Sequence, residues 1–206
     1  DGILERLQIE RLDSLLLHRP DALMEPEEVA EAFDHLEQAG KVRHFGVSNQ
    51  NPMMMELLKT AVKQPLKVNQ LQLSAAFTPS FEAGFHVNME GPKAAVRDGS
   101  VFEYCRLNDT VIQAWSVLQH GYFKGNFVGK EEFAALNHVL TDLAKKYQVT
   151  PTAIALAWVL RYPSKMQAVI GTTKPQHVLE AGKAAEVTLT RKEWYQIYLA
   201  AGNDLP

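Results

Sequence analysis

Polar and aromatic residues follow, or end, several short apolar runs of this chain that are typical of buried β-strands. They comprise an imidazole, amides, hydroxyls, an indole and a small-residue turn, in chain order His18, Ser48-Asn49, Gln70, Trp115-Ser116 and Gly171-Thr172-Thr173. In parallel α/β folds, functional groups gather where strands end and the following loops begin. The pattern therefore predicts one site assembled from residues that lie far apart in the sequence.

The chemistry of this set suits a planar heteroaromatic ring that carries an amide and is attached to phosphates. The indole of Trp115 can stack on such a ring, while Ser, Asn and Gln side chains supply the mixed donors and acceptors that a carboxamide needs. The turn Gly171-Thr172-Thr173 precedes a predicted helix, whose positive end favours a phosphate. His18 can donate a hydrogen bond to a substrate carbonyl oxygen.

Each of these residues also has an ordinary structural interpretation. A lone histidine after a strand is more often structural than catalytic. Ser48-Asn49 is more often a turn or a helix N-cap, because Asn51-Pro52 follows it. Trp115 in an apolar strand is more often a core residue, Gln70 can satisfy a neighbouring backbone group, and Thr172-Thr173 can cap the next helix. On spacing alone these alternatives stay open.

Composition restricts the class of protein. The 206 residues are 46% hydrophobic and 22% charged, which favours a globular chain over a disordered one. The net charge is −3 and no basic block occurs, so we expect no nucleic-acid partner. The longest apolar run, Ala153–Leu160, is far shorter than the roughly 20 residues that span a bilayer, so we expect no membrane partner. A lone Cys105 and a start without signal-peptide features favour a reducing, cytoplasmic setting.

Sequence motifs of common nucleotide and metal sites are missing. The chain has no G-x-G-x-x-G and no G-x-x-x-x-G-K-[ST], which removes the usual sequence support for a Rossmann domain or a P-loop. We expect no metal site, because no two of the following histidines have metal-ligand spacing: His35, His44, His86, His120 and His138.

The elements that must position the site residues alternate between strand-like and helical apolar patterns, which predicts five βα units around a parallel sheet. Strands are predicted at about Leu12–Leu17, Lys41–Val47, Lys67–Leu73, Thr110–Trp115 and Gln167–Ile170. Helices are predicted at the start (Ile3, Leu4 and Leu7 on one face), from Pro26 to a C-cap at Gly40, and over Met53–Val62, Val101–Arg106, Glu131–Tyr147 and Pro151–Arg161, with two more from about Pro175 and from Thr190.

Capping residues and one long irregular stretch complete the predicted organisation. Thr150 is a plausible N-cap, and Thr190 and Glu193 have capping-box spacing. From Ala75 to Ser100 the chain shows no clear period, and a loop of this length is usually functional or mobile. No repeat or composition break interrupts the alternation, so residues 1–206 are predicted to form a single α/β domain.

Five segments, taken in order, resemble the aldo-keto reductase family. They are LLLHRPD (Leu15–Asp21), GKVRHFGVSN (Gly40–Asn49), NQLQLS (Asn69–Ser74), AWSVLQHG (Ala114–Gly121) and VIGTTKPQHVLEA (Val169–Ala181). The resemblance covers essentially the whole chain and is closest to bacterial cytosolic oxidoreductases of the family. It implies a (β/α)8 TIM barrel, of which this chain would form strands four to eight, and the reduction of aldehydes or ketones with NADPH.

The resemblance also implies a role for each site residue. His18 would orient the substrate carbonyl, Trp115 would stack on the nicotinamide, and the carboxamide would be held by Ser48, Asn49 and Gln70. Ser116 and Leu118 would make the family's contacts with the pyrophosphate. The contacts with the adenosine phosphate would be made by Gly171, Thr172, Thr173 and His177. Many members place an arginine on the 2′-phosphate where this chain has His177, with Lys174 nearby, so NADH stays an alternative to NADPH.

The chain also departs from the family's pattern. The family's catalytic Asp, Tyr and Lys lie on segments that come before the point where this sequence begins, and none of its own tyrosines lies in the family's catalytic motif. A (β/α)8 barrel typically needs about 250 residues, and five parallel strands alone would leave two unpaired edges. We therefore predict an incomplete barrel, whose first three units are absent from this sequence or are supplied by another chain.

Three functions fit this pattern. The first is an NADPH-dependent aldo-keto reductase that acts on a small carbonyl compound. The second is a non-catalytic module that senses the cofactor, like the potassium-channel β-subunits built on the same fold. The third is an inactive, truncated chain that acts as an interaction fragment. The sequence does not identify the physiological substrate.

Overall fold

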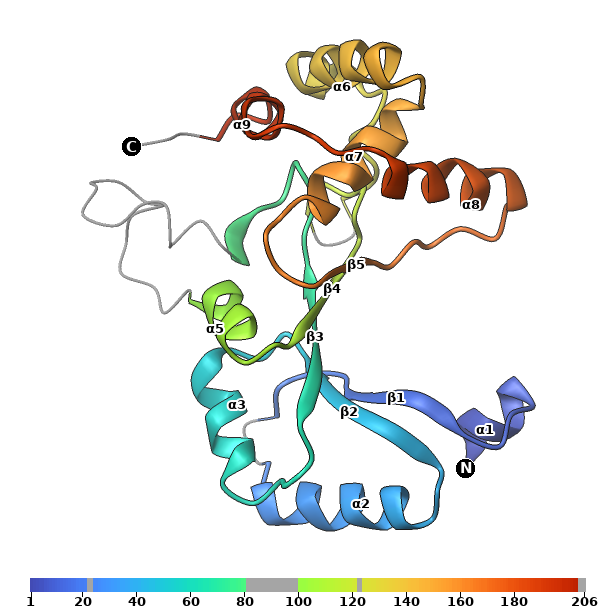
Figure 1. Ribbon diagram of the computed structural model, residues 1–206, viewed down its shortest axis with the longest axis vertical. Helices are drawn as coiled ribbons and strands as arrows, with labels where there is room; N and C mark the ends of the chain where they lie inside the picture. The colour runs from blue at the N-terminus through green and yellow to red at the C-terminus, as the bar shows by residue number, and fades with distance from the viewer. Residues whose placement is uncertain (22–23, 81–99, 122–123, 204–206) are drawn as a thin grey trace. The chain divides into compact units, whose positions relative to one another are not determined.

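The computed structural model describes residues 1–21, 24–80, 100–121 and 124–203 of the chain (Figure 1). The strands hydrogen-bond in chain order, and the pairs β1–β2 and β2–β3 are parallel. Parallel neighbours that follow one another in the chain need helical crossovers, and this confirms the predicted α/β architecture. The five strands are β1 (Leu12–Leu17), β2 (Val42–Ser48), β3 (Leu66–Gln72), β4 (Val111–Trp115) and β5 (Met166–Ala168).

The helices begin and end close to the predicted positions. Two differences concern the stretch from Glu131, which opens with a 3-10 turn, and the helix after Pro52, which ends earlier than expected. None of the described helices is long and apolar enough to cross a membrane. The helices are α1 (Gly2–Leu7), α2 (Pro26–Gln38), α3 (Pro52–Lys59), α5 (Val101–Leu107), α6 (Ala134–Tyr147), α7 (Pro151–Leu160), α8 (Pro175–Gly182) and α9 (Arg191–Ala200), with 3-10 turns η1 (Glu131–Phe133) and η2 (Lys183–Glu186).

The chain divides into two compact units. The first contains Asp1–Gln70 and Ser100–Ile112, and the second contains Leu71–Gly99 and Gln113–Pro206. The boundary passes through β3 and β4, so each unit holds part of both strands. The single domain expected from the sequence therefore stays a prediction. Most of the expected loop from Ala75 to Ser100 lies outside the described residues.

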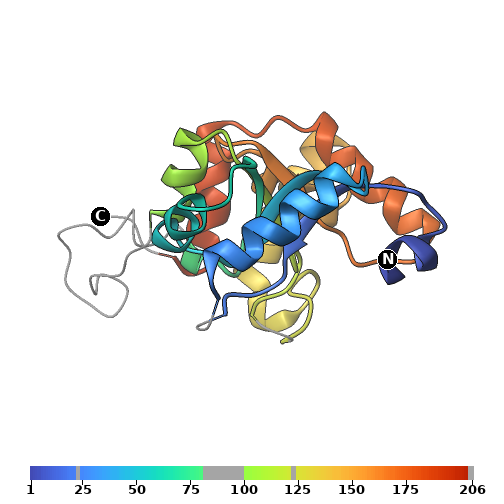
Figure 2. The ribbon, with the colours of Figure 1, turned by 90° about the horizontal axis from the view of Figure 1, so that it is seen from below.

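The core of the first unit lies between its strands and the helices α2 and α3, which lie beside these strands in both views (Figure 1, Figure 2). The ring of Phe33 on α2 stacks on Phe45 of β2, with 4.1 Å between ring centroids. Met55 and Leu58 of α3 are fully buried in the same cluster. The apolar stripe expected on α2 is therefore the face that packs on the sheet.

Helix α2 ends as its sequence predicts. Gly40 has φ 68°, a left-handed conformation that glycine adopts without steric cost. The N–H groups of Gly40 and Lys41 donate to the carbonyl oxygens of Glu37 (2.9 Å) and Leu36 (3.0 Å). This pair of bonds is a Schellman motif, which satisfies the last carbonyls of the helix and turns the chain into β2.

The first helix lies at the surface. The helical conformation of α1 is confirmed, but its predicted apolar face is exposed, with Ile3 at 43% and Leu7 at 58% of their full accessible area. No residue of α1 is buried. Periodicity correctly predicted the helix, and its apolar side chains Ile3 and Leu7 are exposed.

The second unit is organised around α7, whose central residues are all buried. Trp158 of α7 and Trp194 of α9 stack with ring centroids 4.8 Å apart and planes 9° from parallel. Each indole N–H donates to the other residue's carbonyl oxygen at 3.0 Å. Because the central residues of α7 are all buried, the helix needs no polar face. The indole N–H of its tryptophan is hydrogen-bonded within the core.

Helix α9 begins with the predicted capping box. The Thr190 side chain accepts from the N–H of Glu193 (3.2 Å), and the Glu193 carboxylate accepts from the N–H of Thr190 (2.8 Å). The same carboxylate accepts from Lys146 (2.5 Å) and from the Tyr147 hydroxyl (2.9 Å). Burial of this carboxylate opposes its ionisation, but the bonds from Lys146, Thr190 and Tyr147 outweigh burial and lower the pKa of Glu193 to about 2.

Gly46 in β2 permits the close approach of the strands on either side, and this predicts a clear mutational effect. A Cβ atom at Gly46 would lie 2.5 Å from the Val68 carbonyl oxygen and 2.6 Å from Leu16 Cδ2. Gly46→Ala should therefore lower the free energy of unfolding by about 2–3 kcal/mol, measured by urea denaturation. The control is Gly182→Ala in α8, where the added Cβ meets nothing within 4 Å. Equal, small effects of the two substitutions would contradict this packing.

Glu193 predicts a pH-dependent contribution to stability. Because its folded-state pKa lies below the ordinary value of 4.5, its contribution is fully present above about pH 5. It is lost as the pH falls from there towards 2. At pH 7, Glu193→Gln should cost on the order of 2–3 kcal/mol, and the cost should shrink steadily in unfolding titrations at lower pH. Glu186→Gln, at an exposed position, is the control, and a cost that does not vary with pH would contradict the account.

Candidate functional site

In the first unit, the ends of β1 and β2 lie beside Gln70, two residues before the end of β3. Leu17 of β1 is in register with Val47 of β2, and Ser48 is in register with Gln70 of β3. His18 follows β1 directly, so it occupies the strand position next to Ser48. The parallel register thus brings three of the predicted site residues to one end of the sheet, as expected for functional groups in α/β folds.

Ser48 and Asn49 are fixed by hydrogen bonds to β3. The Ser48 hydroxyl donates to the Gln70 carbonyl oxygen at 2.9 Å, and the Asn49 side-chain amide donates to the Ser48 oxygen at 2.9 Å. The Asn49 backbone N–H also donates to the Gln70 carbonyl oxygen, at 3.0 Å. Asn49 has φ 55°, a left-handed conformation that asparagine tolerates better than most residues. The side-chain oxygen of Asn49 takes part in none of these bonds.

Of the two structural alternatives for Ser48-Asn49, the helix N-cap is wrong and the turn remains. Helix α3 is capped by Asn51, whose side chain accepts from the N–H of Met54 at 2.9 Å. Ser48-Asn49 therefore forms a separate turn between β2 and the cap. The alternative for Gln70, that it satisfies a backbone group, stays untested.

Two buried amides beside this turn were not predicted from the sequence. The Asn69 side-chain N–H donates to the Gln50 carbonyl oxygen at 2.9 Å, and the two residues are 0% and 2% exposed. Their side-chain oxygens are buried, and neither has a hydrogen-bond partner within the described ranges. A buried acceptor without a partner costs about 1–3 kcal/mol and is uncommon in folded proteins. These two side-chain oxygens add two buried acceptors beside the turn that contains Ser48.

His18 lies in an exposed position immediately after β1. Its ordinary interpretation as a structural histidine is not tested by this exposure. An exposed histidine can be an ordinary surface residue or a catalytic one, so the catalytic role of His18 stays a prediction.

The second unit contains a pocket of about 540 Å³. It lies between the end of β4, the turn after β5 and the helices α7 and α8, elements that Figure 1 shows in yellow to red. Six of the residues predicted from the sequence line it, and Thr173 is the one predicted residue of the turn that does not. The six are Trp115, Ser116, Leu118, Gly171, Thr172 and His177.

Backbone bonds position the β4 end of this pocket. The Trp115 carbonyl oxygen accepts from the N–H of Leu73 at 3.3 Å, and the Ala114 carbonyl oxygen accepts from Val169 at 2.8 Å. Ser116 then has φ 52°, and its carbonyl oxygen accepts from the N–H of Gln119 at 2.8 Å. This left-handed residue turns the chain sharply after the strand, so Trp115 and Ser116 both line the pocket. Trp115 is half-buried and is not simply a core residue.

The opposite end of the pocket is formed by the turn before α8. The N-cap of α8 is Lys174, which makes no side-chain cap bond. Thr172 instead accepts from the N–H of Lys174 at 3.2 Å, and its hydroxyl lies 3.4 Å from His177 Nδ1. The alternative in which Thr172-Thr173 caps α8 is therefore wrong. Thr172 stabilises the turn that leads into the helix and presents His177 beside it.

The pocket has the size of a small-molecule site and a wall that is partly polar. Small-molecule pockets commonly measure about 300–1,000 Å³. Its polar wall combines hydroxyls and amides, and the buried side-chain oxygen of Gln119 has no hydrogen-bond partner in the described part of the chain. No atom lies within 4 Å of the place where a Cβ of Gly171 would be, so the backbone there is open to a ligand. A ligand with an aromatic ring and several polar groups fits this wall.

Sequence reasoning missed the pocket residues that come from helices and loops. Glu180 lies one helical turn after His177, and this spacing was the one signal that could have identified it. The residues contributed by α7 carried no local signal, because they belong to a helix whose sequence is otherwise that of a buried element. The missed polar residues are Gln119, Asn126, Thr152 and Glu180.

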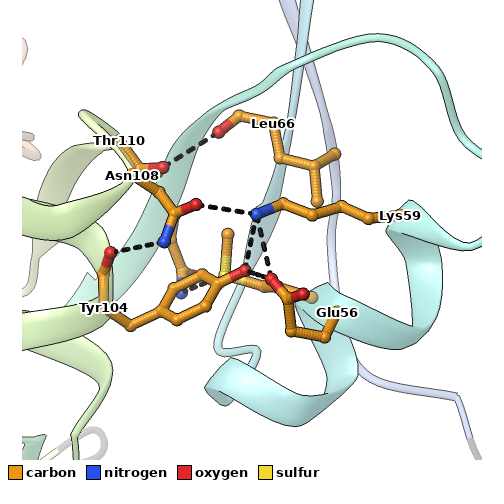
Figure 3. A network of polar contacts seen from close by, with 8 residues as sticks. Glu56, Lys59, Leu66, Tyr104, Asn108 and Thr110 are labelled. Atoms are coloured by element: carbon orange, nitrogen blue, oxygen red, sulfur yellow. Dashed lines mark hydrogen bonds and ion pairs between the residues drawn. The ribbon is translucent and has the colours of Figure 1, made fainter.

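A second polar cluster lies on the helices of the first unit (Figure 3). Lys59 contacts Glu56 (3.0 Å), Tyr104 (2.6 Å) and Asn108 (3.0 Å), and the Tyr104 hydroxyl donates to the Glu56 carboxylate. The bonds from Tyr104 and Lys59 lower the pKa of Glu56, while burial and the carboxylate raise that of Tyr104. The cluster links α3 to α5 and does not lie at a strand end, so it gives no reason to assign Tyr104 a catalytic role.

Comparison with known proteins identifies the family. Residues 1–200 match the model of the Aldo/keto reductase family, and the chain belongs to this family. It is 35% identical over 202 residues to "Oxidoreductase YdhF" of Escherichia coli, covering 97% of this chain and 61% of that protein. It is 34% identical over 207 residues to "6-dehydroglucose reductase" of Agrobacterium fabrum, covering 100% of this chain and 62% of that protein.

The fold agrees with solved structures of the family. An aldo-keto reductase of Klebsiella pneumoniae in complex with NADPH matches with a TM-score of 0.72 and 24% identity, over 94% of this chain and 60% of the other. The chain thus spans about three-fifths of the length of the relatives it matches. The structural likeness supports the aldo-keto reductase type of α/β fold.

The left-handed backbone of Ser116 predicts an unusual effect of glycine. Because a non-glycine residue is strained at φ 52°, Ser116→Gly should raise the free energy of unfolding by about 0.5–1 kcal/mol in urea denaturation. Ser14→Gly at an exposed position of β1 is the control, and it should lower stability, since glycine weakens strands. An equal loss for both substitutions would mean that Ser116 is not left-handed.

Proposed function

We propose that the chain is the cofactor-binding part of an aldo-keto reductase, which reduces aldehydes or ketones to alcohols by hydride transfer from NADPH. The observation that carries the proposal is the pocket of the second unit. Six residues selected from the sequence for contact with nicotinamide, pyrophosphate or adenosine phosphate line one cavity of about 540 Å³, a size common for small-molecule sites. Relatives described as oxidoreductases and a structural neighbour in complex with NADPH support the same function.

The residues of the second unit would bind the dinucleotide. The indole of Trp115 stacks on the nicotinamide ring, and Ser116 and Leu118 contact the pyrophosphate. The turn that contains Gly171, Thr172 and Thr173 receives the adenosine phosphate together with His177. Hydroxyls and open backbone N–H groups suit this task, because they bind phosphate oxygens without a bulky side chain between.

The residues of the first unit would orient the reacting groups. Ser48, Asn49 and Gln70 offer the donors and acceptors that a carboxamide needs, and the bonds that fix Ser48 and Asn49 reduce the entropy lost on binding. When bound, the cofactor supplies the hydride that is added to the carbonyl carbon. The exposed imidazole of His18 donates a hydrogen bond to the carbonyl oxygen and stabilises the charge that develops there.

We also propose that further strands complete the barrel, either from segments outside this sequence or from another chain, including a second copy. β1 and β5 end the strand order, and strand edges with unpaired backbone groups favour association. Beside β1, the apolar side chains of Ile3, Leu7 and Ile9 are exposed. A proton donor for the alcohol oxygen would come from the completing strands, as the resemblance implies.

The proposed setting is the cytoplasm, and the proposed partner is a small carbonyl compound.

The single thiol agrees with a structural role, because Cys105 is fully buried and burial raises its pKa to about 11. A protonated, inaccessible thiol is neither a metal ligand nor a nucleophile.

Titration of the chain with NADPH tests the proposal. The chain has three tryptophans, and binding should quench the emission of Trp115, with saturation. Trp115→Phe should abolish most of the saturable quenching, while Trp158 and Trp194 report any nonspecific loss of signal. Absence of saturable binding would contradict the proposal and favour an interaction fragment.

Turnover separates the reductase from a cofactor sensor. With the barrel complete, an aldehyde panel should consume NADPH, followed by its absorbance. Tight binding with negligible turnover across the panel would instead favour the sensing module.

A further inference from the structure

A buried hydroxyl is bonded to the wall of the pocket in the second unit. It belongs to Ser74, which comes two residues after the end of β3 and is fully buried. The Ser74 hydroxyl donates to the carbonyl oxygen of Gln119 at 2.6 Å, 45 residues further along the chain. Gln119 lines the pocket, whereas Ser74 is not part of the described lining. Both residues belong to the second unit, so the bond lies within one compact body.

This bond holds one end of the turn that follows β4. Within the turn, the Gln119 N–H donates to the Ser116 carbonyl oxygen at 2.8 Å, and Ser116 has φ 52°. A serine in the left-handed region is strained, and such a conformation persists only where surrounding contacts maintain it. The start of the turn is held by the Leu73 N–H, which donates to the Trp115 carbonyl oxygen at 3.3 Å. Two adjacent residues, Leu73 and Ser74, therefore hold both ends of the strained turn.

Ser74 is itself held in place by backbone bonds. Its N–H donates to the Phe77 carbonyl oxygen at 3.0 Å, and the Phe77 N–H donates to the Ser74 carbonyl oxygen at 3.1 Å. Because both backbone groups are bonded and the side chain is buried, the hydroxyl is a donor in a fixed place. Without it, the partly buried carbonyl oxygen of Gln119 would lose a donor that water replaces poorly.

Other backbone bonds hold the same turn in a different way. The Phe127 N–H donates to the Leu118 carbonyl oxygen at 3.0 Å, and the His120 N–H donates to the Gly125 carbonyl oxygen at 3.2 Å. These bonds join the turn to the loop that continues from it. They do not hold it against the segment after β3, which is what the hydroxyl of Ser74 does.

The inference rests on the proposed function, in which Trp115 stacks on the nicotinamide while Ser116 and Leu118 contact the pyrophosphate. We propose that Ser74 is a positioning residue for this part of the cofactor. Its bond to Gln119 maintains the turn that presents Trp115 and Ser116 to the pocket. Ser74 acts through the turn and does not contact the cofactor, because it lies outside the described lining.

A positioning role predicts a selective loss of affinity in Ser74→Ala. Calorimetry on the full chain, at one pH and salt concentration, should show that the dissociation constant for NADPH rises by about tenfold, since the loss of one hydrogen bond corresponds to about that factor. Adenosine 2′,5′-bisphosphate, which contains the adenosine end alone, should bind unchanged. The turn before α8 is held by its own bond, from the Lys174 N–H to the Thr172 hydroxyl at 3.2 Å. The fraction of Trp115 emission that saturating NADPH quenches should also fall.

Thr110→Val is the matched control. Thr110 is buried in the first unit, and its hydroxyl donates to the Leu66 carbonyl oxygen at 3.2 Å (Figure 3). Like Ser74→Ala, this variant removes a buried hydroxyl that is bonded to a distant carbonyl oxygen. It should lower the midpoint of urea unfolding, as Ser74→Ala does, but leave both dissociation constants and the quenched fraction unchanged. If Ser74→Ala does not fold, Ser74→Cys keeps the size and a weak donor, and it should show the same selective loss to a smaller extent.

The outcomes separate this inference from the function on which it rests. If the wild type binds NADPH and the folded variant binds it equally well, the inference is wrong and the proposed function stands. Equal losses of affinity for NADPH and for the bisphosphate would also overturn the inference, because Ser74 would then stabilise the whole pocket rather than position the turn. Failure of the wild type to bind either ligand would overturn the proposed function and the inference together.

Discussion

The parallel register of β1, β2 and β3 is the constraint on which the first half of the candidate site depends. With Leu17 opposite Val47 and Ser48 opposite Gln70, the ends of β1 and β2 lie beside Gln70 of β3. The close spacing at Gly46 is part of the same constraint, since any side chain there would separate β2 from the strands beside it. A slip by one residue would exchange the faces of a strand and remove the bonds that fix Ser48 and Asn49.

In the second unit, turns and helices rather than strand register position the predicted site residues. Its pocket depends on a left-handed residue after β4, on an open glycine turn after β5 and on two helices that close the sides. Polar but mostly uncharged groups line this wall, which suits a ligand that is recognised by hydrogen bonds and stacking. Hydroxyls and backbone groups of this wall are the groups that the proposed dinucleotide would use for its phosphates.

Much of the fold and part of the site follow from local patterns. Strand and helix positions, the glycine that ends α2 and the capping box of α9 were predictable because each depends on neighbouring residues. The exposure of α1 and the pocket contacts made by Thr152 and Glu180 depend on packing between distant segments, which periodicity does not report. The left-handed Ser116 was missed for a related reason, since serine has no strong preference for that conformation. The roles assigned to the eleven predicted site residues stay predictions.

The central claim is that the pocket of the second unit binds the dinucleotide through the residues after β4 and β5. The most direct measurement is a nitrogen–proton NMR titration of the chain with NADPH. The account predicts saturable shifts of the Trp115 indole signal and of the Gly171 and Thr172 amides, with little change at the Trp158 indole, which is bonded within the core. Shifts confined to other parts of the chain, or no saturable shifts at all, would contradict it.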